Sequence, residues 1–338
     1  MKLKVNIISE SAFSIGGHGV DTAFREHVLA LGERNDVLVR VNQLGSADIT
    51  HVHTTGPYGL VALVLGGNKK VVTAHVVPDA FVGTVAGAKY WYRLAAWYLK
   101  FFYNRADKII AISEEVEQSL IRKLGIKSDK ITVIPNTVDT AQYKPAKDGK
   151  RLARQKLGLG STDFIVLSVG QINPTKRYES FLSLAKQFPG FRFIWIGGTP
   201  FKHLSASYKD MLELTHKQPA NMSTIGPLEH SEVKQYYWAA DVFIMPSNRE
   251  GHPLAVLEAA AAGLPIVVRD IPSYDSNFGQ DILRGTDKTF AHIVQRLHDN
   301  QVYYREAVEL SRAIATKFDN ASGAKQLCRL YRQLIASK

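Results

Sequence analysis

The chain has 338 residues, of which 45% are hydrophobic and 22% are charged, a composition typical of globular proteins rather than disordered segments. Its length suits two domains of about 150 residues each. The single cysteine, Cys328, excludes an internal disulfide framework and a cysteine-rich metal site. The net charge of +11 favours an anionic partner such as a nucleotide, an acidic lipid surface or a nucleic acid.

Neither a leader nor a membrane span is expected from the sequence. The longest uncharged run, Tyr58–Gly67, is too short to cross a bilayer. The first residues, Met1–Asn6, meet polar side chains at once, so they do not form the apolar region of a secretion signal. Together with the single cysteine, these features predict a cytoplasmic protein.

Short runs rich in β-branched residues alternate with longer segments of helical apolar periodicity. This order is typical of parallel sheets covered on both faces, and two sets of five or six strands predict two doubly wound α/β domains. We expect the break in the charged stretch 141–160, between an N-terminal domain over 1–145 and a C-terminal domain over 160–316. A last helix is expected within 317–338. The expected strands are Lys4–Ser9, Val37–Val41, Ile49–His53, Lys70–Ala74, Lys108–Ser113, Lys130–Pro135, Phe164–Gly170, Phe191–Gly197, Met222–Ile225, Asp241–Pro246 and Pro265–Arg269.

A glycine-rich loop, Ser14–Val20, separates the first strand from the first helix and contains Gly16 and Gly17. Glycines let the backbone come close to a ligand, and a helix N-terminus offers free N–H groups to an anion. A plain tight turn would explain the same residues. The loop lacks the dinucleotide fingerprint, because Thr22 occupies the third glycine position, so an NAD-dependent oxidoreductase is not expected.

Histidines mark the ends of two predicted strands. His75 follows an apolar strand, where it could hydrogen-bond a sugar hydroxyl or carry a proton, although a structural role fits the same position. His51 and His53 share one face of their strand. No third ligand stands at metal-binding spacing, so a zinc site is not expected there.

The loop Gly170–Arg177 opens the second domain and brings Lys176 and Arg177 to the start of a helix. Cations there oppose the helix dipole, and a bound diphosphate would explain both charges. A solvated basic loop is the alternative. Further on, Glu250 follows a strand and Glu258 stands in an alanine-rich helix. Burying a carboxylate in such a helix is costly unless it accepts hydrogen bonds, for instance from ribose or sugar hydroxyls.

The block from Glu250 to Glu258, with its following Ala-x-x-x-Gly-x-Pro-Ile-Val, resembles the E-x7-E signature of retaining glycosyltransferase family 4. The glycine loop, His75, Val133–Asp139, Lys176 and Ala239–Ser247 agree with that family in order and position. The resemblance implies the GT-B fold, with two Rossmann-like domains facing a cleft. Nucleotide-sugar would bind the C-terminal domain and acceptor mostly the N-terminal one, and the C-terminal helix would cross back to the N-terminal domain.

The resemblance also implies roles for single residues. Glu258 would hold the ribose, Glu250 the transferred sugar and Lys176 the leaving diphosphate, while His75 would touch the sugar at the reacting centre. Backbone N–H groups near Gly16, Gly17 and Leu254 would assist Lys176. Gln171 occupies a place where the family usually has Arg, which leaves Arg177 as a candidate replacement. No Asp-x-Asp occurs in the chain, so we expect no metal or other cofactor.

The segment Lys89–Tyr103 is unusually aromatic, with eight aromatic residues among 15. At 100° per residue its three cations fall on one stripe, and a basic stripe beside aromatics suits a helix lying on anionic lipid. A crossover helix with buried aromatics is the alternative. The residues expected at the membrane are Lys89, Trp91, Arg93, Trp97 and Lys100.

Within the family, the chain looks closest to bacterial glycolipid synthases that add a second hexose to monoglycosyl-diacylglycerol. The similar stretches are Ser11–Val20, Ala74–Asp79, Val169–Gln171, which keeps the subgroup's Gln, and Trp195–Phe201. This resemblance implies a UDP-hexose donor, glucose before galactose, a lipid-linked sugar acceptor and a peripheral location on the cytoplasmic face of the membrane. A soluble family member that glycosylates polysaccharides, small molecules or proteins is the alternative. A nucleic-acid-binding protein is remote, because no motif of that class occurs.

Overall fold

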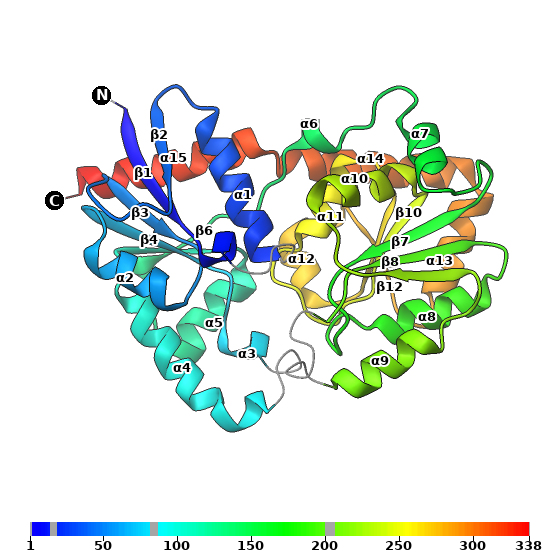
Figure 1. The fold of residues 1–338 in the computed structure, drawn as a ribbon, viewed down its shortest axis with the longest axis horizontal. Coiled ribbons are helices and arrows are strands. Elements are labelled where there is room, and N and C mark those ends of the chain that lie inside the picture. The colour runs from blue at the N-terminus through cyan, green and yellow to red at the C-terminus, as the bar shows by residue number, and fades with distance from the viewer. Residues whose placement is uncertain (1, 14–18, 82–86, 200–206, 338) are drawn as a thin grey trace. The chain divides into compact units, whose positions relative to one another are not determined.

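The computed structural model describes residues 2–13, 19–81, 87–199 and 207–337 (Figure 1). The described chain divides into two compact units. Unit 1 holds the chain up to residue 81 together with 87–137 and 318–337, and unit 2 holds 138–317. Each unit is a parallel α/β sheet, so the predicted fold class is confirmed.

Unit 1 is built on a six-stranded parallel sheet with the order β2-β1-β3-β4-β5-β6. In register, Val5 pairs with Val39 on one side and Ile49 on the other. Because the strands are parallel, their carboxyl ends lie at one edge, where His53 and His75 follow neighbouring strands. The strands are β1 (Leu3–Ile8), β2 (Val37–Val41), β3 (Ile49–Val52), β4 (Lys69–Ala74), β5 (Lys108–Ala111) and β6 (Ile131–Val133).

Helices cover both faces of this sheet (Figure 1). Successive residues of a strand point to opposite faces, so Val72 packs with α2, α4 and α5, and Val71 packs with α1 and α15. This two-sided burial explains why the strands read as continuous apolar runs. The helices of unit 1 are α1 (Gly19–Gly32), α2 (Pro57–Leu65), α3 (Pro78–Phe81), α4 (Ala88–Asn104), α5 (Glu114–Leu124) and α15 (Asn320–Ala336), with short 3-10 turns η1 (Glu10–Phe13) and η2 (Ser128–Lys130).

The C-terminal helix α15 packs within unit 1. Asp319 caps its first turn by accepting a hydrogen bond of 2.9 Å from Ala321 N. Thr137 Oγ1 donates to Asn320 Oδ1 at 2.8 Å, and the Asn320 amide in turn donates to Glu26 of α1. These bonds fix the start of α15, and its buried stripe, including Tyr331, covers the sheet.

Unit 2 has a second six-stranded parallel sheet, in the order β12-β11-β10-β7-β8-β9. Its central strands β7 and β10 are neighbours, with Val166 opposite Val242. The loops that follow these two strands therefore start side by side. The strands are β7 (Ile165–Val169), β8 (Arg192–Ile196), β9 (Met222–Ile225), β10 (Val242–Met245), β11 (Ile266–Arg269) and β12 (Leu283–Gly285).

The helices of unit 2 also cover both faces of their sheet. Val242 and Ile244 of β10 pack with α8, α9 and α13. Phe243, which points the other way, meets the ring of Tyr237 from α10 at 5.8 Å. The helices are α6 (Thr140–Tyr143), α7 (Gly149–Lys156), α8 (Tyr178–Gln187), α9 (Tyr208–His216), α10 (His230–Ala239), α11 (Leu254–Ala261), α12 (Pro272–Phe278), α13 (Phe290–Asp299) and α14 (Gln301–Lys317).

The stretch 141–160, expected as a charged break, differs from a loose connection. The division of the chain falls between Thr137 and Val138, and the stretch contributes α7 and most of α6 to unit 2. Arg154 of α7 is buried and donates to Ala239 O at 3.0 Å and to Asp241 Oδ2 at 2.7 Å. The charged residues of this stretch predicted a break between domains, but Arg154 within it is buried and fixes α7 to unit 2. The short strand β12 was also missed, because three residues show no period.

Candidate active site

One candidate site lies where two loops of unit 2 meet. The loop after β7 carries Lys176, and the loop after β10 carries Glu250. Asn248 N donates to Thr175 O at 2.9 Å and ties the loops together. Neighbouring parallel strands thus place at one edge two residues that are far apart in sequence.

Lys176 and Glu250 form an ion pair. Lys176 Nζ lies 2.6 Å from Glu250 Oε1, with the lysine side chain 21% exposed and the glutamate 9% exposed. A pair this sheltered is screened less than a surface pair. The lysine side chain is nevertheless still partly in reach of solvent.

Asn173 shapes the loop that presents Lys176. Its Oδ1 accepts hydrogen bonds from Thr175 N at 3.0 Å and from Lys176 N at 3.1 Å. Its amide donates to Gln171 Oε1 at 3.3 Å, which ties the predicted binding residue Gln171 into the same turn. Such local side-chain bonds replace regular secondary structure and hold the lysine at the start of α8.

Arg177 is engaged by carboxylates of its own unit. It adopts the left-handed conformation, with φ 55°, and precedes α8. Its guanidinium lies 3.0 Å from Glu179 Oε1 and 3.2 Å from Asp287 Oδ2. Arg269 also pairs with Asp287, at 2.6 Å. These partners neutralise Arg177, so it is the predicted anion-binding residue that the geometry favours least.

Glu258 lies within α11 and is 6% exposed. Tyr237 OH donates to Glu258 Oε2 at 2.7 Å, and His230 Nε2 lies 3.7 Å from Oε1. Burial, together with the Glu258 charge, raises the pKa of Tyr237 well above its usual range, so the phenol remains a donor. One carboxylate oxygen is thus held by tyrosine, and the other faces a weaker partner.

A second layer supports this carboxylate. Tyr143 OH and His230 Nδ1 are hydrogen-bonded at 2.8 Å, and the rings of Tyr143 and Tyr237 meet edge to face at 5.9 Å. Tyr143, His230 and Tyr237 were not predicted from the sequence, because none of them belongs to a motif. The helices α6, α10 and α11 meet only in the folded unit. Leu254 is buried at the first position of α11, whose N-cap, Pro253, makes no side-chain capping bond. The first N–H groups of α11 are therefore not used by a side-chain cap.

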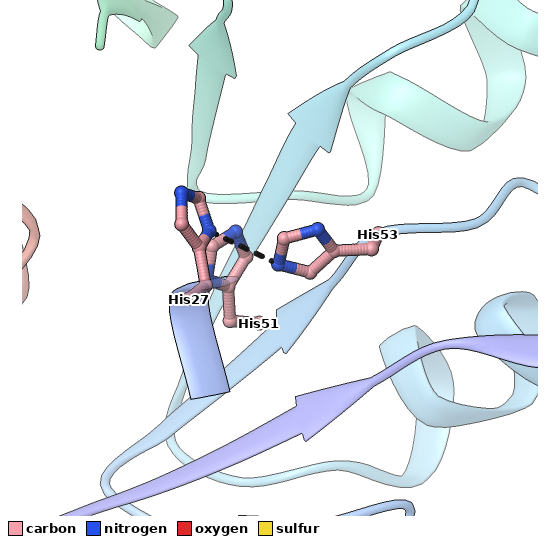
Figure 2. A group of neighbouring side chains, drawn as sticks. All are labelled: His27, His51 and His53. Atoms are coloured by element: carbon pink, nitrogen blue, oxygen red, sulfur yellow. Dashed lines mark hydrogen bonds between the residues drawn. The ribbon is translucent and has the colours of Figure 1, made fainter. Parts of the chain in front are cut away.

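A second candidate site, in unit 1, is a group of four histidines, three of which, His27, His51 and His53, are drawn in Figure 2, and the fourth is His75. His53 Nδ1 lies 3.1 Å from His75 Nε2, and His53 Nε2 lies 3.3 Å from His27 Nδ1. His51 is held separately, with Nδ1 2.7 Å from Tyr331 OH and Nε2 2.7 Å from Thr73 Oγ1. His75 is half-buried, and the other three rings are buried.

The expectation that no third candidate ligand accompanies His51 and His53 was wrong. His27, on α1, brings the group to three, with one nitrogen of each ring within 4.8 Å of the others. His51 stands on β3 and His53 follows it directly, and α1 packs on this strand, a contact that no local spacing encodes. Burial lowers the pKa of His27 to about 4 and the pKa of His51 and His53 well below the usual range.

The aromatic segment forms helix α4, with one face turned outward. The exposed side chains Tyr90, Leu94, Trp97 and Phe101 follow each other at helical spacing, and Trp97 is 63% exposed. The rings of Trp97 and Phe101 stack at 5.9 Å. Leu99, Phe102 and Tyr103 form the buried face. The segment therefore has a buried aromatic face, as the crossover-helix alternative expects, and an exposed aromatic face, while contact with a membrane stays a prediction.

The residues predicted at a membrane divide between these faces. Arg93 and Lys100 are exposed beside the aromatic stripe. Trp91 is half-buried, with its ring 5.1 Å from that of Phe81. The side chain of Lys89 lies outside the described part of the structure, as do Gly16 and Gly17 of the glycine loop. None of the described helices combines the length and apolarity needed to pass through a bilayer.

Comparison with protein families gives two matches that together cover most of the chain. Residues 16–142 match the family described as Glycosyltransferase Family 4. Residues 149–287 match the family described as Glycosyl transferases group 1. The second match contains Lys176, Glu250 and Glu258.

Curated relatives and solved structures agree with these matches. The chain is 30% identical over 278 residues to alpha-galactosylglucosyldiacylglycerol synthase of Streptococcus pneumoniae, covering 81% of this chain and 74% of the relative. It is 28% identical over 307 residues to an Escherichia coli UDP-Gal:alpha-D-GlcNAc-diphosphoundecaprenol alpha-1,3-galactosyltransferase, covering 86% and 76%. Anabaena HepE, solved with UDP-glucose, superposes with a TM-score of 0.76 at 16% identity, over 98% of this chain and all of the other.

Proposed function

This chain belongs to glycosyltransferase family 4, and on that basis we propose that it moves a hexose from a UDP-sugar to a lipid-linked sugar at a membrane surface. The proposal includes retention of configuration at the transferred carbon and independence of metal ions. The acceptor class is a glycolipid such as monoglycosyl-diacylglycerol. Two relatives support this class, because the name of one includes diacylglycerol and that of the other diphosphoundecaprenol, both of which are lipids.

The observation that carries the donor half is the Lys176–Glu250 ion pair in the unit that also buries Glu258. A fixed ammonium stabilises charge that develops on a departing diphosphate, and it does so best where water is scarce. In this proposal Glu250 accepts hydrogen bonds from the hydroxyls of the transferred sugar. Glu258 accepts from the ribose, for which Oε1 is the available oxygen because Tyr237 holds Oε2.

The proposed reaction proceeds on one face of the sugar. The bond between the anomeric carbon and the β-phosphate oxygen breaks, and the bond from the acceptor oxygen forms on the same side. The acceptor hydroxyl proton passes to the departing phosphate oxygen, so UDP leaves with the electron pair and no covalent enzyme intermediate is needed. His75, in unit 1, contacts the transferred sugar in this proposal.

The membrane half of the proposal rests on helix α4. Its outward stripe of Tyr90, Leu94, Trp97 and Phe101 would enter the interface, while Arg93 and Lys100 would meet anionic head groups. The protein would then act peripherally on the cytoplasmic face, where a water-soluble UDP-sugar meets a lipid-bound acceptor. A soluble acceptor would leave this exposed stripe without a use.

The test is transfer of radiolabelled hexose to monoglucosyl-diacylglycerol in anionic vesicles, with UDP-glucose tried first and UDP-galactose second. NMR of the product reports whether configuration is retained, and transfer should persist in EDTA. Lys176→Ala and Glu258→Ala should each remove most activity while the protein stays folded. Lys217→Ala is the matched control, because that lysine is exposed and pairs only with its neighbour Glu213 among the described residues.

Full transfer by both site variants would overturn the assigned donor site. Transfer only to a soluble sugar, with none to a lipid-linked acceptor, would favour the soluble alternative. Both donors are tried because glucose and galactose differ at one hydroxyl, and contacts around the site select between them.

A further inference from the structure

Three histidines form a continuous hydrogen-bonded chain that ends at His75 (Figure 2 shows two of them with His51). His27 on α1 bonds to His53, and His53 bonds to His75 through its other ring nitrogen. The rings of His53 and His75 also stack, with centroids 5.3 Å apart and planes 28° apart. The small angle between the planes and the hydrogen bond together fix how the ring of His75 lies against that of His53.

The middle ring of this chain has one proton to share. Burial keeps the pKa of His27 and His53 well below the usual range, so both rings are neutral at pH 7. A neutral imidazole has one donor nitrogen and one acceptor nitrogen. If His53 donates from Nδ1, then His75 Nε2 accepts and the proton of His75 is on Nδ1. If His53 donates to His27 instead, then His75 must donate from Nε2.

The tautomers of the three rings are therefore coupled. Each arrangement of the chain fixes whether Nδ1 of His75 is a donor or an acceptor. A ring that presents the wrong nitrogen state to a substrate loses catalysis even when its position is unchanged. The tautomer of His75 thus depends on His53 and, through His53, on His27, neither of which needs to touch a ligand.

A bound cation would be another use for such a cluster, but the contacts favour hydrogen bonding. Both nitrogens of His51 already lie 2.7 Å from hydroxyl oxygens, so a metal would displace Tyr331 or Thr73. Among the described residues, the group within ligand distance contains histidines alone. A divalent ion there would be buried with no neighbouring carboxylate of that group to offset its charge.

We propose that His53, backed by His27, is a positioning residue that fixes the orientation and the tautomer of His75. This inference rests on the proposed function, in which His75 contacts the transferred sugar. His51 belongs to a separate pair of hydrogen bonds and does not take part. The group is thus a device for presenting one nitrogen of His75 in one protonation state.

The test uses two substitutions of His53, each of which keeps one of its two hydrogen bonds. The side-chain amide of asparagine lies where Nδ1 of histidine lies, and that of glutamine lies where Nε2 lies. His53→Asn therefore keeps a partner for His75, and His53→Gln keeps one for His27. We expect His53→Gln to lower kcat for hexosyl transfer by about tenfold, the value of one hydrogen bond, with little change in KM for the UDP-sugar. His53→Asn should retain most of kcat.

A structural readout accompanies the kinetics. Nitrogen-15 NMR of the histidine rings should show one tautomer for His75 in the native protein and in His53→Asn, and a mixture in His53→Gln. Thr73→Val, which removes a partner of His51 but leaves the chain intact, should leave the His75 signal unchanged. Equal kinetics and equal His75 tautomers for the asparagine and glutamine variants would overturn the proposal.

Two further outcomes separate this inference from its neighbours. Full transfer by His75→Ala would remove His75 from the proposed reaction, yet the NMR comparison would still decide whether His53 sets its tautomer. One equivalent of zinc or nickel in the purified protein, lost in His27→Asn, would show a metal site and would overturn the hydrogen-bonded chain.

Discussion

Tyr237 donates a 2.7 Å hydrogen bond to Oε2 of Glu258 in the interior of unit 2, and both side chains are buried. A buried carboxylate without such a donor would be strongly destabilised. The bond therefore satisfies Oε2 of Glu258, while Oε1 lies 3.7 Å from His230 Nε2. The phenol is fixed in turn by the ring of Tyr143.

Replacing this tyrosine should weaken nucleotide binding more than it weakens the fold. Tyr237→Phe removes the donor and leaves the ring, so we expect the Kd for UDP to rise about tenfold, equivalent to one hydrogen bond to a charged group. Isothermal titration with UDP measures this. Tyr236→Phe, on the half-buried neighbour, should bind UDP as the native protein does. Native affinity in Tyr237→Phe would show that the phenol does not orient Glu258.

The buried arginine of α7 should be a strong determinant of stability. Arg154 donates to three backbone carbonyls and to Asp241, so Arg154→Ala removes this donor from the three carbonyls and one of the partners of Asp241, which also pairs with Lys150 and accepts from Ile165 N. We expect unfolding to become easier by about 3 kcal/mol, as for other broken buried pairs. Urea denaturation measures this. Arg151→Ala, on the exposed side of the same helix, should change stability by less than about 0.5 kcal/mol.

Stability should fall as the pH is lowered through the range in which free histidine titrates. The folded state holds the pKa of His27 at about 4 and those of His51 and His53 well below 6.5, so the unfolded state binds more protons between about pH 6.5 and 4. The stabilisation is complete above pH 6.5 and is lost toward pH 4. Each such proton contributes about 1.4 kcal/mol per pH unit.

Substitution of single histidines shows how much each contributes to the pH dependence of the free energy of unfolding. His27→Asn keeps a polar group near Nδ1 but does not titrate, so its free energy of unfolding should depend less steeply on pH, by about 1.4 kcal/mol per pH unit. Urea titrations at several pH values between 7.5 and 5 give the slope. His216→Gln, at an exposed position, should keep the native slope. An unchanged slope in His27→Asn would mean that His27 titrates normally in the folded state.

Membrane binding should depend on the cations of α4. The double variant Arg93→Glu/Lys100→Glu reverses two exposed charges, so we expect binding to anionic vesicles to weaken by about thirtyfold or more. Sedimentation with phosphatidylglycerol vesicles measures it. The control Lys325→Glu/Arg329→Glu makes the same charge change on α15, at the other face of the sheet. Equal loss in both variants would indicate a general charge effect and not a docking face.

The sequence by itself determined the fold class and the succession of strands and helices along the chain. Apolar runs of β-branched residues are local signals, and so are the glycine loop and the Glu250–Glu258 block. Family resemblance added the GT-B fold, which the family matches and the likeness to Anabaena HepE bear out. Composition also marked α4 as aromatic and basic, because that property belongs to one continuous segment.

Only the tertiary structure decided which side chains meet. Lys176 reaches Glu250 because β7 and β10 are neighbours in the sheet, although 74 residues separate the two side chains. His27 joins His53 because α1 packs on β3, and Trp91 turns toward Phe81 because its position on α4 faces away from the exposed stripe. Arg154 is buried because Asp241 and three backbone carbonyls, all distant from it or outside its helix, pack around its guanidinium. Periodicity records the environment of a residue within its own element, whereas hydrogen-bond partners depend on how elements pack, and that packing is not written locally.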